Sequence, residues 1–293
     1  MMITMADDVH HAPYVVVLGI AQDGGRPQAG CRNSCCAFEA PVHHPACLAI
    51  VDPRSGTRWI IDATPALPAQ LRALETITGA SPDRVVDGVL LTHAHIGHYT
   101  GLIHLGREAM ATDHVPVWCG ERLRALITEH DPWRRLVEHG HVTVHPDDQI
   151  RLADDLTVTA LAVPHRDEIS DTVAYRITGP NRSVLWLPDI DSWEAWDTSG
   201  VRLESVLESV DVAWLDATFW DDDELDRDMS LIPHPRARAT LDRLSATRPD
   251  LINRVRFVHL NHTNPLLNAA SIEYHTTIAL GAGVAAQGDV EPL

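Results

Sequence analysis

The stretch Leu-Leu-Thr-His-Ala-His-Ile-Gly-His, residues 90–98, decides how the rest of the chain is interpreted. It continues an apolar segment that predicts a short buried strand. His93 and His95 are two positions apart, so an extended backbone points both imidazoles to one side, and His98 follows three residues later. Imidazole is a common zinc ligand, and α/β folds build their sites at strand ends. We therefore predict a metal site here; the alternative is three unrelated surface histidines in a chain that has 18.

The composition excludes several classes of partner. The chain has 293 residues, enough for one large domain or two small ones, and 45% of them are hydrophobic, which suits a globular core. With 23 basic against 41 acidic residues the net charge is −18, and such a surface repels phosphate backbones and anionic lipid. We expect a small-molecule substrate, no nucleic acid and no membrane partner; a homodimer stays open.

The N-terminal segment and the cysteines indicate the compartment. Residues 1–13 contain acids and histidines but no basic or apolar run, so we expect a disordered tail rather than a signal peptide. The sequence contains no run of about 18 apolar residues, so it predicts no membrane span. Five cysteines, an odd count, favour reduced thiols over a disulfide framework. These features predict a cytoplasmic protein with one domain over residues 14–293.

Apolar periodicity predicts strands and helices that follow a similar order in the two halves of the chain. The acidic run 221–228 is expected to be a solvated loop or lid, and the tail after Pro265 shows no clear pattern beyond one short helix. The expected strands are 14–20, 47–52, 58–62, 85–91, 116–119, two within 142–163, 171–178, 183–187, 210–215 and 255–258; the expected helices begin at Thr64 and cover 99–111, 121–138 with a break near Pro132, 236–245 and 269–275.

A glycine-rich loop, residues 21–31, follows the first strand. Such a loop can bring its backbone close to a ligand, although an ordinary turn is the alternative. Asp23 or Gln22 in this loop could face a substrate. Cys31, Cys35 and Cys36 come next and suggest half of a zinc-binding knuckle, an incomplete pattern by itself. Cys47 and Cys119 lie in apolar runs and are expected to be small core residues.

Further metal donors follow later predicted strands. His165, Asp189 and His259 each come at the end of an apolar segment. Together with the first three histidines they make five imidazoles and one carboxylate. This set suits one or two ions of zinc, manganese or iron.

The motif at residues 91–98, with the order of the later donors, resembles the metallo-β-lactamase superfamily. That resemblance implies an α/β (α+β) fold, a four-layer αββα sandwich with metals at one edge of its two sheets. It also implies zinc as the leading cofactor, with iron or manganese as alternatives. The implied ligands are His93, His95 and His165 for one metal, His98 and His259 for the second, and Asp189 as the bridge.

The sequence departs from the superfamily motif at one position. The usual motif has an aspartate directly before its last histidine, and here that residue is Gly97. The second metal thereby loses a carboxylate ligand, and the reacting water loses a group that would orient it. We expect weaker or absent occupancy of the second position, or a different metal.

Within the superfamily, three segments resemble the coenzyme PQQ synthesis protein B family: residues 17–19 with the following loop, 216–220 and 257–265. That family has a Cys-x-Cys-x-x-Cys structural zinc site, which Cys31 and Cys36 match. Asn33 stands at the middle position, where Cys35 can substitute. Related carbon-phosphorus-lyase phosphodiesterases add a histidine that corresponds to His262. The alternative is free thiols with His262 as a core hydrogen-bonding residue.

Intact imidazoles at the first motif indicate a paralogue with its own activity, since the family that makes coenzyme PQQ has a degraded motif there. The leading hypothesis is a metal-dependent hydrolase that uses a metal-activated water on a phosphodiester, ester or lactone. In it, Asp189 holds the metal and orients the water, and Asp23 faces the substrate. The second hypothesis is a metal-dependent oxidoreductase or oxygenase in cofactor or natural-product biosynthesis. The third is a binder or carrier without catalysis.

Overall fold

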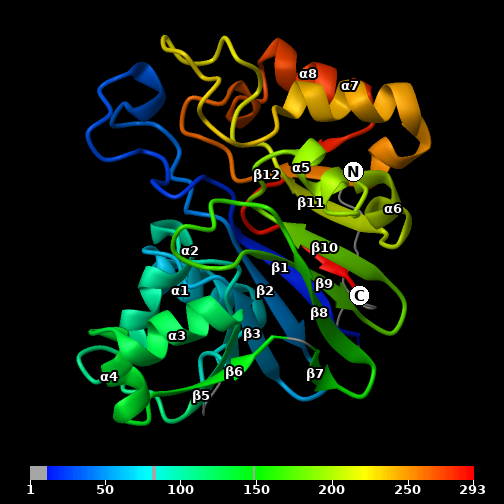
Figure 1. Ribbon diagram of the computed structural model, residues 1–293. Coiled ribbons are helices and arrows are strands. Elements are labelled where there is room, and N and C mark those ends of the chain that lie inside the picture. Colours follow the sequence, from blue (N-terminus) through cyan, green and yellow to red (C-terminus); the bar gives the residue numbers. More distant parts are fainter. Residues whose placement is uncertain (1–11, 81–83, 148) are drawn as a thin grey trace.

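Two seven-stranded sheets pack face to face, with helices on both outer surfaces (Figure 1). The computed structural model describes residues 12–80, 84–147 and 149–293. The first sheet has the order β14-β1-β2-β3-β4-β5-β6 and the second β13-β12-β11-β10-β9-β8-β7. The predicted four-layer αββα sandwich is confirmed. The predicted tail falls mostly outside the described residues, and the single domain over 14–293 stays a prediction.

Each sheet with its helices takes up roughly one half of the chain. The first half contains β1 (Tyr14–Gly19), β2 (Cys47–Asp52), β3 (Thr57–Ile61), α1 (Leu67–Thr78), β4 (Gly88–Leu90), α2 (Ile96–Tyr99), β5 (Val115–Cys119), α3 (Glu121–Glu129), α4 (Trp133–Glu138) and β6 (Val142–Pro146). The second contains β7 (Ile150–Ala153), β8 (Leu156–Ala162), β9 (Val173–Thr178), β10 (Ser183–Leu187), α5 (Trp193–Thr198), α6 (Leu203–Glu208), β11 (Val212–Asp216), α7 (Ala237–Thr247), β12 (Val255–Val258), α8 (Ile272–Ala279) and β13 (Gly283–Val284). The last strand, β14 (Val290–Pro292), returns to the first sheet beside β1.

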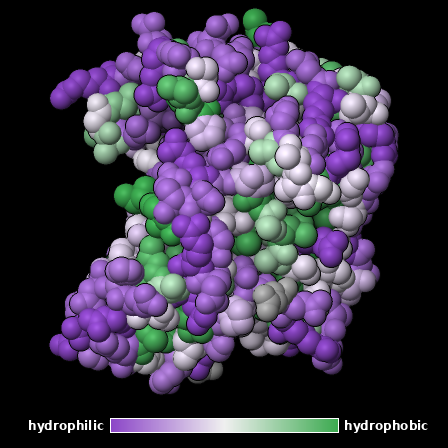
Figure 2. Space-filling view, in the orientation of Figure 1, coloured by the Kyte–Doolittle hydropathy of each residue, from purple (hydrophilic) through white to green (hydrophobic). Residues whose placement is uncertain are grey.

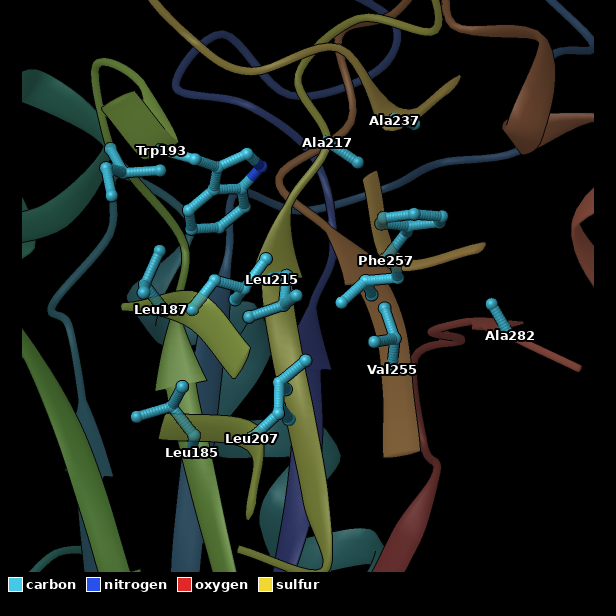
Figure 3. Packing of buried hydrophobic residues seen from close by; sticks show 14 of the residues in the cluster. Leu185, Leu187, Trp193, Leu207, Leu215, Ala217, Ala237, Val255, Phe257 and Ala282 are labelled. Carbon is cyan, nitrogen blue, oxygen red and sulfur yellow. The ribbon is translucent and has the colours of Figure 1, made fainter. Parts of the chain in front are cut away.

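The strands are apolar on both faces because each sheet packs against helices on one face and against the other sheet on the opposite face. Along β10, Leu185 and Leu187 face the helices, as Figure 3 shows, while Val184 and Trp186 belong to the core between the sheets. This alternation follows from the two-residue repeat of a strand. A strand buried on both sides therefore appears in the sequence as a continuous apolar run, as this one does.

Parallel pairing brings the functional strand ends together. In the first sheet β3, β4, β5 and β6 run parallel, and in the second β10, β11, β12 and β13 do. Parallel strands place their carboxyl ends at one edge of a sheet, where α/β folds collect their sites. Asp62, the histidine motif, Asp189, Asp216 and His259 all come at or directly after such ends.

The predicted helix over residues 99–111 is wrong. The structure has the four-residue α2, then a 3-10 helix over Thr100–Leu105 and turns. A side chain at Gly101 would meet the backbone oxygen of Thr64 at 2.0 Å, so the chain passes too close to residues 63–64 for a regular helix with side chains there. Gly101 N–H donates to Ala63, whose own N–H donates to the His98 carbonyl. These contacts fix His98 instead of extending a helix.

The other predicted elements are confirmed in some cases and need correction in others. The predicted break near Pro132 is confirmed, since α3 and α4 lie on either side of it. The strand predicted over residues 85–91 is shorter, because only Gly88–Leu90 pairs. Strands β13 and β14 were not predicted, because they have only two and three residues and no apolar alternation. The short helix predicted near 269–275 is found as α8.

Candidate metal centre

The six predicted metal donors converge although they come from both halves of the chain. His93 and His95 follow β4, and His98 lies in α2. His165 follows β8, Asp189 follows β10 and His259 follows β12. Five of the six side chains are almost fully buried, and His95 is half-buried; His93, His98 and His259 are each 1% exposed and Asp189 is 3% exposed.

Donor–donor distances on one side of the centre suit a metal ion. His93, His95 and His165 form a group whose ligand atoms lie within 4.8 Å of one another. His95 Nδ1 is 3.2 Å from His165 Nε2. Ligands that bind a tetrahedral ion at 2.0–2.1 Å lie about 3.3 Å apart. The spacing of this group therefore matches a zinc-sized ion.

Asp189 lies between this group and a second one. Its Oδ1 is 3.5 Å from His165 Nε2, while its Oδ2 is 3.0 Å from His98 Nε2 and 3.2 Å from His259 Nε2. Oδ2 is also 3.9 Å from His93 Nε2, so the carboxylate contacts imidazoles of both groups. That placement suits the bridging role implied by the superfamily resemblance.

The buried donor atoms lack hydrogen-bond partners, which tests whether an ion fits. Among the described residues, Nε2 of His93, His98 and His259 and Oδ2 of Asp189 are buried without a hydrogen bond. Leaving a buried polar atom unpaired costs roughly 1–3 kcal/mol. Four such atoms aimed at one another make sense when a cation satisfies them, so the residues fit a bound metal.

The opposite nitrogens of these imidazoles are held in place. His98 Nδ1 lies 2.7 Å from Asp62 Oδ2, and Asp62 also accepts hydrogen bonds from the backbone and hydroxyl of Thr92. His259 Nδ1 is 2.8 Å from the Thr218 hydroxyl, which donates to Asp216. Such outer partners fix the orientation of a metal-binding imidazole and its tautomer. Asp62 and Thr218 therefore orient His98 and His259 toward the centre.

Protonation also favours metal binding. Burial holds the pKa of His93 well below its usual value and lowers the pKa of His95 and His259. Burial would raise the pKa of Asp189, but His259, His98 and His165 outweigh it and hold that pKa well below its ordinary range. Neutral imidazoles and an ionised carboxylate are the forms that bind metal.

The pKa of His98 shifts in the opposite direction because carboxylates surround this imidazole. Burial would lower its pKa, but Asp62, Asp189 and Asp23 together raise that pKa well above the usual value. Without a cation, His98 takes up a proton to balance this negative charge. A metal ion would supply the same balance.

His234 is a site residue that the sequence analysis missed. Its Nδ1 lies 2.7 Å from Asp216 Oδ2 and 3.8 Å from Asp189 Oδ1. Its ring centroid is 5.3 Å from that of His165 and 5.8 Å from that of His259. It follows no strand, so the strand-end rule could not find it; its position between two prolines was the available signal.

Strained backbone supports the same location. His234 has a φ of 124°, His259 of 62° and Asp62 of 70°. Residues other than glycine rarely adopt positive φ, and such strain concentrates at functional sites. All three residues contact the centre directly or hold one of its imidazoles.

Asp23 lies against the centre, and Gln22 contacts it only through Asp23. Asp23 Oδ1 is 3.3 Å from His98 Nε2, and Asp23, His98 and His259 form a further group with metal-ligand spacing. Gln22 Nε2 donates to Asp23 Oδ2 at 3.1 Å. The predicted catalytic role of Asp23 stays a prediction, but the structure brings a carboxylate to the side of the centre where Gly97 lacks one.

The predicted cysteine cluster also assembles. Cys35 Sγ is 4.0 Å from both Cys31 Sγ and Cys36 Sγ, and His262 Nδ1 is 3.4 Å from Cys35 and 3.5 Å from Cys36. A tetrahedral zinc with three thiolates and one imidazole requires about 3.8 Å between sulfurs and about 3.6 Å between sulfur and nitrogen. Cys35 takes part, whereas Asn33 is exposed. The arrangement fits a structural zinc.

The Cys35 thiol of this cluster is disfavoured as an anion. Burial and the neighbouring Cys31 and Cys36 raise the pKa of Cys35 to about 11. Metal binding would deprotonate the thiols, because thiolates are the ligand form. Cys47 and Cys119 are fully buried in the core, as predicted.

An open groove lies beside His165. It has a volume of about 610 Å³, and its lining includes Arg122, Arg166, Asp171 and Asp191. Asp191 Oδ1 lies 3.1 Å from His165 Nδ1, so the groove reaches a donor of the centre. Figure 2 shows the surface hollowed on its left edge, between the loop after β1 and the helices of the first half.

The acidic segment 221–228 is only partly solvated. Glu224 is turned inward: it accepts hydrogen bonds from the Trp220 N–H, at 2.7 Å, and from the Thr263 hydroxyl. Burial raises the pKa of Glu224 to about 7. The segment is thereby attached to the loop that carries His259 and His262.

No helix in the described ranges combines the length and apolar character needed to cross a membrane. The predictions on nucleic acid, homodimer formation and the cytoplasm stay predictions.

Comparisons with known proteins agree with this geometry. A family model described as a beta-lactamase superfamily domain matches residues 57–260. Coenzyme PQQ synthesis protein B from Nitrosococcus oceani is 26% identical, with 93% of this chain and 97% of that protein covered. The protein of the same name from Stutzerimonas stutzeri is 28% identical, with 94% and 98% covered.

Solved structures show the same fold. The crystal structure of Zn(2+)-bound PqqB from Methylobacterium extorquens has a TM-score of 0.76 at 20% identity, and covers 96% of this chain and 100% of its own. A diphosphatase from the PhnP family has a TM-score of 0.66 at 19% identity, over 96% and 97% of the two chains. The predicted resemblance to PqqB-like metallo-β-lactamase folds is confirmed.

Proposed function

The chain belongs to the beta-lactamase superfamily, and from that premise we propose that it is a metal-dependent hydrolase of a small substrate. The observation that carries the proposal is the convergence of the otherwise unpaired buried atoms of His93, His98, His259 and Asp189. The bond cleaved is a phosphodiester, an ester or a lactone. Zinc is the proposed ion, with iron or manganese as alternatives.

The metal supplies one part of the chemistry. Bound among these donors, it would lower the pKa of a water molecule toward ~7 and polarise the scissile group. The protein contributes orientation: Asp62 and Thr218 fix His98 and His259. Asp189, whose carboxylate lies among the donors of both groups, orients the attacking water.

His234 is the proposed proton donor. Burial would lower its pKa, but Asp216 at 2.7 Å outweighs this effect and raises the pKa, which favours the protonated ring that a proton donor needs. In hydrolysis the leaving oxygen departs as an anion unless it receives a proton. A positioned acid of this kind contributes typically ~10²–10⁴-fold in rate.

The groove beside His165 sets the substrate size. Its volume of about 610 Å³ lies within the range of roughly 300–1,000 Å³ that is usual for small-molecule sites. Arg122 and Arg166 offer positive charge there, against Asp167, Glu168, Asp171 and Asp191. A small substrate with one anionic group fits this mixture better than a polyanion does.

The test is a metal-resolved assay. The chain is purified with zinc, manganese or iron and assayed on bis-p-nitrophenyl phosphate and on simple lactones. We expect turnover with at least one metal, and its loss in His95→Ala. His130→Ala, which removes an exposed imidazole at the end of α3, is the matched control and should retain activity.

Absence of turnover above the His95→Ala background with every metal would contradict the hydrolase proposal. A His234→Gln variant adds a second criterion. It should lower kcat with little change in bound metal, because His234 is proposed to donate a proton rather than to hold the ion.

A second candidate, a metal-dependent oxygenase in cofactor synthesis, is favoured by the curated relatives. These are coenzyme PQQ synthesis proteins that match over more than nine-tenths of this chain. Nitrogen and carboxylate donors without sulfur also suit iron. Protein purified without air would then contain stoichiometric iron in the centre and consume oxygen with its substrate, whereas a hydrolase would not consume oxygen.

A further inference from the structure

The two sides of the centre differ in how they obtain their donors. One side has three imidazoles of its own, from His93, His95 and His165, and shares Asp189. The other has only two imidazoles, from His98 and His259, and shares the same Asp189. The second side therefore has one protein donor fewer than the first.

Asp23 provides a donor atom at that place. Its Oδ1 lies 3.3 Å from His98 Nε2, the separation expected of two ligands of one zinc-sized ion, about 3.3 Å. Asp23, His98 and His259 all place ligand atoms within 4.8 Å of one another. Nε2 of both histidines is buried and has no hydrogen bond in the described part of the chain.

Gly97 makes the approach of Asp23 feasible. Its N–H donates to Asp23 Oδ1 at 3.1 Å. A Cβ at position 97 would lie 2.1 Å from that oxygen and 2.7 Å from the Asp23 Cα, distances that real contacts do not reach. The carboxylate of Asp23 therefore occupies the space into which a side chain at position 97 would project.

Backbone hydrogen bonds fix Asp23 relative to His259. Gln22 N–H donates to the Leu260 carbonyl at 2.9 Å, and Leu260 N–H donates to Ile20 at 2.8 Å. Ala21 and Leu260 form an isolated parallel bridge. The residues next to Asp23 and next to His259 are thus paired, so the two side chains are held at a constant spacing.

We propose that Asp23 is a direct ligand of the second metal and that Gly97 is needed to admit it. This inference rests on the proposed metal-dependent function. It changes the expectation from the sequence that the second position is weak: the position keeps a carboxylate, supplied by the loop after β1. Both sides then have three donors of their own and share Asp189.

The main test compares metal binding by wild type, Asp23→Asn, Gly97→Ala and His98→Ala. Bound zinc per chain is measured by elemental analysis after saturation, and affinity by competition with a chromophoric chelator. Asp23→Asn keeps the shape and the contact with the Gly97 N–H but removes the charge. Asp226→Asn, at an exposed position of the acidic loop, removes the same charge far from this contact and is the control.

We expect Asp23→Asn to bind one zinc equivalent fewer than wild type, as His98→Ala does, or to bind the weakest equivalent at least ~100-fold less tightly. That factor is the upper end of what loss of an outer partner costs, and a direct ligand should exceed it. Gly97→Ala should show the same loss with Asp23 still present, because the added methyl displaces the loop. Asp226→Asn should match wild type.

Wild-type zinc content in Asp23→Asn, with unchanged affinity, would overturn the proposal. So would a wild-type protein that binds no more zinc than His98→Ala. The failure of the hydrolase function is a separate result: zinc lost in Asp23→Asn without any turnover in wild type leaves the ligand assignment standing. Metal-dependent turnover with unchanged zinc in Asp23→Asn removes only the ligand assignment.

Discussion

The buried centre and the cysteine cluster both assemble donors with metal-ligand spacing, but the surroundings of the two differ. In the centre, His93, His98 and His259 are 1% exposed; His93 and His259 follow strands of two packed sheets, and His98 lies in α2. In the cluster, the four donors are all partly exposed and lie in loops and in the short 3-10 helix Ser34–Cys36. The centre has more donors than one ion needs and lies beside a groove, whereas the cluster has four donors for one ion.

This difference indicates different roles. A set of three thiolates and one imidazole suits a structural zinc, whereas a catalytic zinc also binds a water and can expand to five ligands. The cluster joins the loop after β1 to the segment that follows His259, so an ion there would hold both beside the centre. Residues 259–264 therefore connect the two regions.

The largest expected effect is a loss of catalytic rate on substitution of Asp189. Asp189→Asn should lower kcat by ~10³-fold, because loss of a shared anionic ligand removes about 4 kcal/mol of metal-based stabilisation. The thermal midpoint of the metal-free protein should fall as well, because the contact of Asp189 Oδ2 with His98 Nε2, 3.0 Å apart, loses its negative charge. Steady-state kinetics and thermal unfolding measure the two quantities. Activity within a few-fold of wild type would remove Asp189 from the mechanism.

The next prediction concerns the cysteine cluster, where we expect a large loss of stability and a small loss of kcat. Cys35→Ser should remove one zinc equivalent and lower the free energy of unfolding by roughly 2–4 kcal/mol, the size of a typical cross-link between distant segments. The folded variant should keep most of its kcat with saturating zinc. Denaturant titration with and without a chelator measures the stability difference. If the variant keeps its zinc and its stability, the cluster is a group of free thiols.

A smaller effect is expected from the support of the centre. Asp62→Asn replaces the carboxylate that holds His98 Nδ1 at 2.7 Å. Loss of such a partner typically weakens metal affinity ~10–100-fold. Zinc competition should show this decrease, together with a fall in the raised pKa of His98, observable by NMR in the metal-free protein. Unchanged affinity would mean that packing alone orients His98.

The smallest prediction concerns the segment between the two regions. Burial raises the pKa of Glu224 to about 7 from 4.5, so the folded state binds more protons than the unfolded state between these pH values. Its contribution to stability is present below pH ~4.5 and is lost as pH rises through ~7, by about 2 kcal/mol after discounting for partial exposure.

Glu224→Gln should flatten this part of the pH profile, since an amide does not titrate and can still contact Thr263 and Trp220. Urea unfolding of the zinc-saturated wild type and variant at pH 5 and pH 7 isolates the effect by difference. If the free energy of unfolding depends on pH equally in wild type and variant, Glu224 has the same pKa in the folded and unfolded states.

The sequence by itself determined the fold and the positions of the six donors. Each donor except His98 directly follows an apolar segment, and apolar periodicity indicates where a strand ends. Parallel strands bring the ends before His93, Asp189 and His259 to one edge of each sheet, whereas His165 follows the antiparallel strand β8. That all the donors meet was implied by the superfamily resemblance. The same reasoning fails for residues 99–111, because the close approach of Gly101 to residues 63–64 cannot be recognised from periodicity.

Only the tertiary structure decided which partners complete the centre. Asp62, Asp216 and His234 were not singled out as site residues in the sequence, and contacts between distant segments bring them to the imidazoles. Asp23 was predicted to face the substrate, and only the fold places it beside His98. Gly97 shows the physical reason most clearly. In the sequence it is a missing carboxylate, but in the fold its lack of a side chain leaves space for Asp23, because backbone pairing with Leu260 delivers that loop to the same point.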